Sequence, residues 1–109
     1  MKLAITSTDG VHVNEHFGMA RKFYIYEYGQ GKTQFLEKRQ PVDIYSLRNK
    51  NHPYDHDRFM MVLKVIEDCQ LVFTKRIGPA PIEKLQEHGI EPVVFEGNIN
   101  EVFQMLPKA

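Results

Sequence analysis

Several things are scarce in this sequence of 109 residues, and each scarcity removes a class of protein. There is one cysteine, Cys69, so neither a disulfide within the chain nor a cysteine-only metal site is possible. An excess of either charge is also missing, because 14 basic residues balance 14 acidic ones. Nucleic-acid-binding proteins usually carry a basic excess, so the balance argues against nucleic acid as the main partner.

Long hydrophobic runs are absent too. Before the polar stretch that begins at Thr6, only a short apolar run is present, which is too little for the apolar region of a secretory signal. No run approaches the length of a membrane span, so we expect a cytoplasmic protein with no membrane partner. With 42% hydrophobic and 26% charged residues, residues 1–109 are expected to fold as a single domain.

What the sequence does contain is a polar loop between two predicted strands. Apolar residues 3–5 predict a short buried strand over 2–6, and alternation over 21–28 predicts another. The loop over residues 9–18 holds two imidazoles, two carboxylates and two glycines. Imidazoles are common metal ligands, and glycines let a backbone approach a ligand closely. Because α/β proteins place their chemistry in loops at strand ends, this loop is the first candidate site.

The rest of the chain is predicted from hydrophobic period and from capping residues. The predicted elements are, in order, strands over 2–6, 21–28 and 33–39, a helix capped by Asp57, a strand over 70–74, a helix over 79–87, a buried strand over 92–95 and a helix capped by Asn98 with Glu101. Residues 43–56 have no clear period and are predicted to be an exposed loop. Strands that alternate with helices imply parallel pairing, and the hairpin implies an antiparallel member. The fold class is therefore α/β, with a mixed five-stranded sheet and helices on its faces.

If the strands over 2–6 and 70–74 are parallel neighbours, the loops that follow them share one edge of the sheet. Lys75 and Arg76 then lie near His16, where their charges can offset that of a bound anion. A plain solvated basic turn explains the two cations equally well.

Gly78 precedes the predicted helix over 79–87, and the amide groups at a helix start receive anions. Pro79 and Pro81 remove two of those donors, which weakens the cradle. Gly78 is nevertheless a candidate binding residue of the same edge.

These residues resemble the dinitrogenase iron–molybdenum cofactor biosynthesis family, the NifX-like domain that also forms the C-terminal part of NifB. The resemblance covers essentially the whole chain. It is carried by Asp9-Gly10, by the segment 13–18 with its His-Phe-Gly element, and by segments 68–73, 77–78 and 89–90. The His-Phe-Gly element at this distance from the N-terminus is fairly specific.

The resemblance implies a ribonuclease H-like fold. It also implies binding or carriage of an iron–sulfur or iron–molybdenum cofactor precursor during nitrogenase assembly, with other cofactor-assembly proteins as partners. His16 stands at the histidine of the family's His-Phe-Gly element and is the first candidate ligand. Gly18 more simply serves a turn, but its missing side chain would leave room for a large cluster.

Other candidate ligands have a simpler interpretation beside the functional one. His12 is four residues from His16 in a loop, where it is a further candidate metal ligand or a solvated side chain. His52 and His56 have the same spacing in the middle loop, where they are candidate metal ligands or ordinary surface residues. Cys69 precedes a buried strand, so core packing is favoured over a reactive role.

Three functions follow from this sequence. The leading interpretation is a non-catalytic carrier of a metallocluster. A regulatory or protein-interaction module without a cluster is the alternative. A nuclease or other hydrolase fits less well, because two-metal chemistry needs several carboxylates from strand positions and the first strand carries none. Motifs of nucleophile elbows, P-loops and dinucleotide-binding proteins are absent as well.

Overall fold

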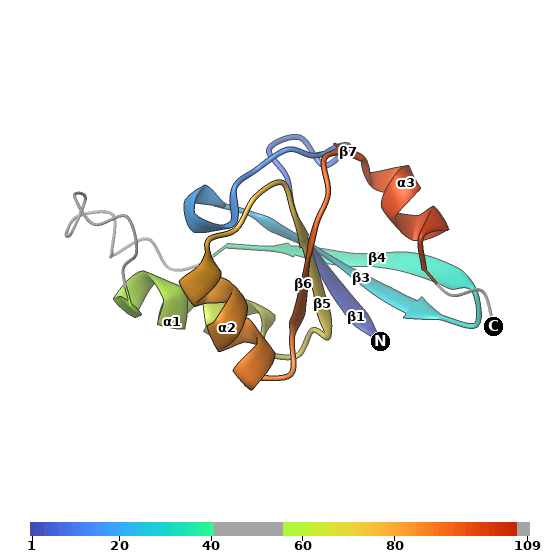
Figure 1. Cartoon of the computed structure of the whole chain (residues 1–109). Helices are drawn as coiled ribbons and strands as arrows, with labels where there is room; N and C mark the ends of the chain where they lie inside the picture. Colours follow the sequence, from blue (N-terminus) through green and yellow to red (C-terminus); the bar gives the residue numbers. More distant parts are fainter. Residues whose placement is uncertain (41–55, 107–109) are drawn as a thin grey trace.

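The central strand of the protein is β1 (Lys2–Thr6), and a mixed five-stranded sheet is built on both sides of it (Figure 1). In this computed structural model, residues 1–40 and 56–106 are described. The strand order is β4-β3-β1-β5-β6. The other strands are β3 (Phe23–Gly29), β4 (Lys32–Arg39), β5 (Leu71–Thr74) and β6 (Glu91–Val94). β3 is antiparallel to β1 and to β4, whereas β5 is parallel to β1 and to β6, which confirms the predicted mixed sheet.

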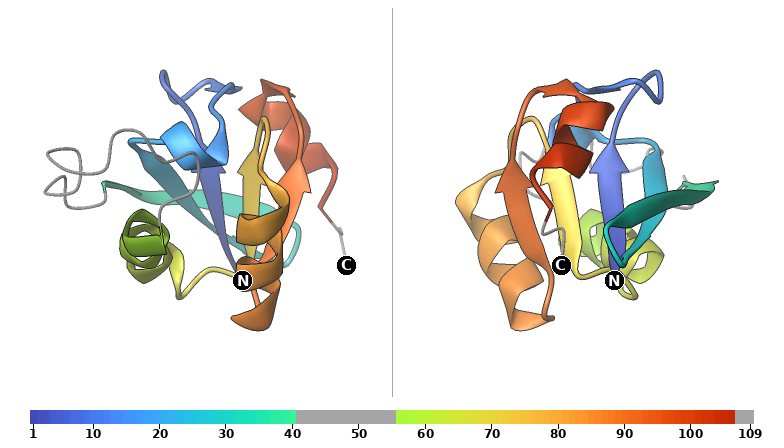
Figure 2. Two further views of the ribbon diagram at one scale, coloured as in Figure 1. Left: turned by 60° about the vertical axis from the view of Figure 1, so that its left-hand side comes forward. Right: turned by 90° about the vertical axis from the view of Figure 1, so that its right-hand side faces the viewer.

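The helices cover both faces of this sheet. α1 (His56–Ile66) and α2 (Pro79–Glu87) lie on one face and α3 (Ile99–Gln104) on the other (Figure 2). β1 serves both faces, since Ala4 joins the cluster under α1 and α2 while Leu3 and Ile5 join the cluster under α3. Within the described ranges, no helix is long and apolar enough to cross a membrane.

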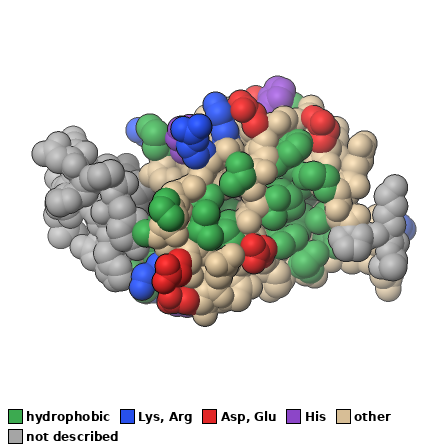
Figure 3. Space-filling view, viewed as in Figure 1, with side chains coloured by type: hydrophobic (Ala, Val, Ile, Leu, Met, Phe, Trp, Pro, Cys, Tyr) green, Lys and Arg blue, Asp and Glu red, His purple; other side chains and the backbone are tan. Residues whose placement is uncertain are grey.

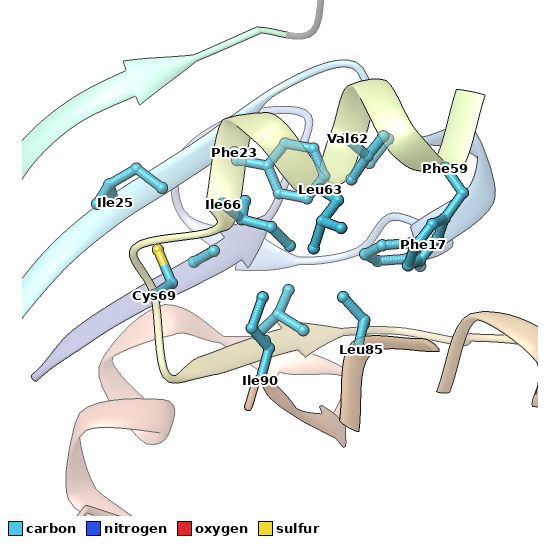
Figure 4. Packing of buried hydrophobic residues seen from close by; sticks show 13 residues of the cluster. Phe17, Phe23, Ile25, Phe59, Val62, Leu63, Ile66, Cys69, Leu85 and Ile90 are labelled. Carbon is cyan, nitrogen blue, oxygen red and sulfur yellow. The ribbon is translucent and has the colours of Figure 1, made fainter. Parts of the chain in front are cut away.

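The cluster under α1 and α2 reaches into the loop after β1. Phe17 is only 3% exposed, and its ring centroid lies 6.2 Å from that of Phe23 and 6.4 Å from that of Phe59 (Figure 4). Burying a side chain of this size stabilises a fold by about 1.5–3 kcal/mol. Core packing therefore fixes the position of a loop that the sequence predicts to be functional.

On the opposite face, α3 covers the tyrosines of β3. Tyr26 meets Phe103 edge to face, with 4.9 Å between ring centroids, and Tyr28 is buried. α3 starts with the predicted capping box, in which the Asn98 amide donates to Glu101 Oε1 at 3.0 Å. The short helix thus has a defined start and a fixed place on the sheet.

α2 ends at the glycine that the sequence marks. Gly89 has a φ of +77°, and its amide donates to the Gln86 carbonyl oxygen at 3.1 Å. The Ile90 amide donates to the Leu85 carbonyl oxygen at 2.9 Å, and both side chains are buried in the same cluster. This is the Schellman arrangement, which turns the chain from α2 into β6.

Some predictions about the elements were wrong. α1 begins at His56, so His56 starts a helix rather than ending a loop, and Asp57 lies in the first turn rather than at the cap. β6 is only partly buried, and its Val94 is 61% exposed. Among the strands that the structure describes, β6 is the last of the sheet and has a neighbour on one side only. His52 lies outside the described residues.

The sequence also gave no signal for a second, two-stranded sheet. β2 (His12–Val13) pairs antiparallel with β7 (Gly97–Asn98), residues that are far apart in the chain. His12 is therefore strand backbone and not part of an irregular loop. The pairing ties the loop after β1 to the start of α3.

Candidate functional site

The loops after β1 and β5 are joined by backbone hydrogen bonds at the carboxyl edge of the sheet. The Phe17 amide donates to the Arg76 carbonyl oxygen at 2.8 Å, and the Lys75 amide donates to the Glu15 carbonyl oxygen at 3.0 Å. His16 and Arg76 form a parallel bridge. This confirms the prediction that His16, Lys75 and Arg76 lie at one edge.

Two buried threonines, Thr6 and Thr74, form hydrogen bonds beneath the paired loops after β1 and β5. Thr6 ends β1, Thr74 ends β5, and both are fully buried. Their hydroxyl oxygens are 3.1 Å apart, and Thr74 Oγ1 lies 2.9 Å from the Glu15 carbonyl oxygen. The distances fit a relay in which Thr6 donates to Thr74 and Thr74 donates to Glu15. The sequence analysis missed this pair, although a threonine at the end of each apolar strand was a visible signal.

His16 is the last extended residue before a short 3-10 turn, η1 (Phe17–Met19). The buried Phe17 anchors the turn, while Gly18 and Met19 are exposed. Among the described residues, a Cβ added at Gly18 would meet nothing within 4 Å, so they leave the space beside the turn open. The His16 side chain makes no capping hydrogen bond, so the described residues leave its ring nitrogens available to a ligand.

Lys75 and Arg76 differ in whether their charge is already paired with a carboxylate. Lys75 Nζ lies 3.3 Å from Glu96 Oε2, so part of its charge is already balanced. Arg76 is exposed and has no ion pair among the residues that the structure describes. Blue side chains gather above the sheet at this end of the molecule (Figure 3). Arg76 is thus the better placed of the two to meet an anion.

Gly78 is the N-cap of α2, with extended backbone. The next three residues are Pro79, Ala80 and Pro81, so the first turn offers a single helical amide donor, at Ala80. The Ile82 amide already donates to the Gly78 carbonyl oxygen at 3.2 Å. The helix start can contribute one donor to an anion at this edge, as the prolines indicate.

His12 is held at a different part of the edge. Its Nδ1 lies 2.9 Å from Asp9 Oδ2, and β2 places it opposite Asn98, whereas His16 pairs with Arg76. Asp9 also accepts from the amides of Val11 and His12, each at 2.9 Å. The hydrogen bond from the His12 ring is the main reason that the pKa of Asp9 lies well below its ordinary value. Nδ1 is thus committed to Asp9, and Nε2 is the His12 nitrogen left for a ligand.

The described part of the chain holds no group of three or more His, Cys, Asp or Glu side chains that could bind a metal ion. Cys69 is 2% exposed, as predicted for a core residue, and burial raises the pKa of its thiol to about 12. It precedes β5, at the sheet edge opposite His16. A metal at His16 would therefore need most of its coordination from outside the described residues.

The fold and the paired loops define the class: this is a small α/β protein with an available histidine beside two cations, at the carboxyl ends of its central strands β1 and β5. The chain belongs to the dinitrogenase iron-molybdenum cofactor family, whose profile matches residues 1–108, which confirms the resemblance seen in the sequence.

Three relatives illustrate the membership. The chain is 36% identical over 104 residues to the FeMo cofactor biosynthesis protein NifB of Frankia alni, covering 95% of this chain and 19% of that protein. It is 33% identical over 91 residues to Protein NifY of Klebsiella pneumoniae, covering 83% and 36%. It is 27% identical over 93 residues to Protein NifX of Rhodobacter capsulatus, covering 85% and 58%. The chain thus spans about a fifth of the length of the NifB proteins it matches.

Two crystal structures share the fold. PH0822 superimposes with a TM-score of 0.71 at 23% identity, covering 95% of this chain and 87% of that one. The Methanocaldococcus jannaschii protein MJ0327 gives 0.63 at 16% identity, covering 96% and 86%.

Proposed function

We propose that this chain is a non-catalytic carrier that transiently binds an iron–sulfur or iron–molybdenum cofactor precursor during metallocluster assembly. The observation that carries the proposal is the backbone junction between His16 and Arg76, which holds an available imidazole beside an exposed guanidinium. Membership of a family whose relatives are named for FeMo cofactor biosynthesis supports it.

In this proposal, His16 supplies one neutral imidazole nitrogen to an exposed iron or heterometal. The cluster's own sulfides provide the remaining coordination, which is why a single protein ligand is sufficient. Arg76 and the partly paired Lys75 reduce the cost of holding a negatively charged cluster, and Gly18 leaves space for it. Gly78 and the start of α2 follow Arg76 closely in the chain, and in this proposal they offer the cluster one amide donor.

The other histidines have secondary places in the proposal. Asp9 orients His12 so that Nε2 can serve as a further ligand for a large cluster or for a handover step. His52 and His56 are proposed as additional ligands from the middle segment. Their side chains lie outside the described residues.

We also assign the fold to the ribonuclease H-like type, with residues 1–109 as one domain. Three antiparallel strands in the order β4-β3-β1 followed by two parallel strands, β5 and β6, support this assignment. A carrier is favoured over a nuclease because β1 carries no carboxylate and the described residues form no cluster for two metal ions.

A protein-interaction function is the second candidate, and one observation favours it. Apolar side chains gather along β6 and beside α3 on the face seen in Figure 3. Val94 is 61% exposed there. A carrier that exchanges its cluster with other assembly proteins would use such a surface too.

The decisive experiment is an anaerobic titration of the protein with a cofactor precursor, followed by visible absorption and iron content. His16→Ala should keep the fold and weaken binding at least tenfold, which corresponds to about 1.4 kcal/mol. His88→Ala is the matched control, because His88 is exposed at the far end of α2 and bonds to the Lys84 carbonyl oxygen. Equal affinity of wild type and His16→Ala would overturn the site.

A further inference from the structure

We propose that Met19 provides a thioether ligand next to His16, so that the turn over residues 16–19 binds a soft, low-valent metal through one nitrogen and one sulfur. The inference rests on the proposed function, because it uses the same His16 site at the carboxyl ends of β1 and β5. It adds the Met19 sulfur as a second ligand atom, and this sulfur indicates which metals the site would bind.

The backbone sets the two side chains in a favourable relation. His16 is the N-cap of η1, Met19 is the third residue of the turn, and the Met19 amide donates to the His16 carbonyl oxygen at 3.0 Å. His16 and Met19 are thus three residues apart across one 3-10 turn. Side chains at this spacing in a 3-10 turn lie over the same side of it. The turn therefore places an imidazole and a thioether on one side, where a metal could reach both.

The backbone of the turn is fixed by the buried Phe17, whereas Met19 is exposed to solvent. Phe17 is 3% exposed and its amide donates to the Arg76 carbonyl oxygen at 2.8 Å, which fixes the backbone. Met19 is 68% exposed, the highest value among the large apolar side chains that the structure describes. Gly18 stands between the two ligands, and a Cβ there would meet nothing within 4 Å. Both donors can therefore reach one point in front of the turn.

The chemistry of the pair selects its ligand. A thioether is a soft, neutral donor that favours Cu(I) and the metals of iron–sulfur clusters over hard cations. The exposed Arg76 beside the pair disfavours a bare divalent cation through charge repulsion. The class that remains is a soft metal of low charge, as a monovalent ion or as the exposed metal of an anionic cluster.

The first test uses silver ion, a soft monovalent probe that needs no reductant, and protein labelled with 13C at its methionine methyl groups. The Met19 methyl resonance should shift and saturate with silver. His16→Ala should weaken the binding read at the Met19 methyl group at least tenfold. Met19→Leu, which keeps the size and apolar character, should weaken it at least tenfold when the shift of the His16 ring protons is followed instead. Met105→Leu is the matched control, since Met105 is 50% exposed at the end of α3. Silver captured by Cys69 does not mimic the result, because the signal is read at Met19.

A second arm repeats the anaerobic titration with a cofactor precursor for Met19→Leu and Met105→Leu. A Met19-dependent loss in both arms assigns the pair to a cluster, and a loss with silver alone assigns it to a free ion. An unshifted Met19 methyl, or equal silver affinity of Met19→Leu and wild type as read at the His16 ring protons, overturns the inference. If silver fails while cluster binding still depends on His16, the proposed function survives. If silver binds but the precursor does not, the proposed function falls.

Discussion

Two glycines of the loop after β1 have different physical roles. Gly10 has a φ of +77°, and a Cβ there would lie 2.9 Å from Cε2 of the Tyr24 ring. Gly18 has neither constraint, because its φ is not in the left-handed region and its surroundings are open. Gly10 is thus required by the fold, whereas Gly18 leaves space at the candidate site.

Gly10→Ala should lower the free energy of unfolding by about 1–3 kcal/mol, because the residue would be strained and would press on Tyr24. Gly18→Ala should change it by less than about 0.5 kcal/mol, as is usual at unconstrained surface positions. Urea denaturation at neutral pH measures both. Equal losses in the two variants would show that the backbone around Gly18 is as constrained as that around Gly10.

At the scale of elements, one ion-pair network ties the end of β4 to the turn before β5. Arg39 binds both carboxylate oxygens of Asp68, at 2.7 and 3.1 Å, and also the Val65 carbonyl oxygen at 2.8 Å. Lys2 Nζ lies 3.0 Å from Asp68 Oδ2. The Arg39 guanidinium is the main reason that the pKa of Asp68 lies well below its ordinary value. Arg39 thus joins β4 to the last turn of α1 and to Asp68, and Lys2 joins β1 to the same carboxylate.

Asp68 should make the fold acid-sensitive. Because its folded-state pKa is lowered, its stabilisation is complete above the ordinary value of 3.8 and is lost as pH falls below it. The free energy of unfolding of the wild type should therefore drop between about pH 7 and about pH 3, and Asp68→Asn should drop less. Some loss should persist in the variant, since Asp9 also has a lowered pKa.

Urea denaturation at the two pH values checks this, with Glu83→Gln on the exposed side of α2 as the control for removing one charge. The prediction fails if Asp68→Asn and Glu83→Gln show the same pH dependence as the wild type. That result would mean that the ion pairs of Asp68 are not the source of the acid sensitivity.

For the whole molecule, the central point is that two hydrophobic clusters share one sheet. Leu85 of α2 is buried in one cluster and Ile99 of α3 in the other, at 0% and 3% exposure. β1 contributes alternate residues to both. Loss of either cluster uncovers one face of the same strands, so the two faces should unfold together.

Leu85→Ala and Ile99→Ala should each lower the free energy of unfolding by about 2–5 kcal/mol. Both variants should keep a single transition in which far-ultraviolet circular dichroism and tyrosine fluorescence coincide. The chain has no tryptophan, and three of its five tyrosines lie on β3, so the fluorescence reports largely on the α3 face. Separate transitions for the two signals would mean that the faces are independent units.

The sequence by itself determined the elements whose causes are local. Strand alternation over β3, the glycine after α2 and the capping box at Asn98 each act within a few residues, so the pattern alone predicts them. The parallel pairing of β1 and β5, and with it the meeting of His16 and Arg76, followed from the alternation of strands and helices. The family was likewise readable from the residues.

Only the tertiary structure decided the rest, because it depends on which distant residues meet. Residues 92–95 read as a buried strand from their apolar residues, yet β6 is only partly buried, at the end of the described strand order. The separation of His12 from His16 arises from their pairing with Asn98 and Arg76, respectively. The partial neutralisation of Lys75 by Glu96 is equally invisible in the chain. Local patterns predict what each segment can become, whereas packing and long-range pairing determine which side chains share a site.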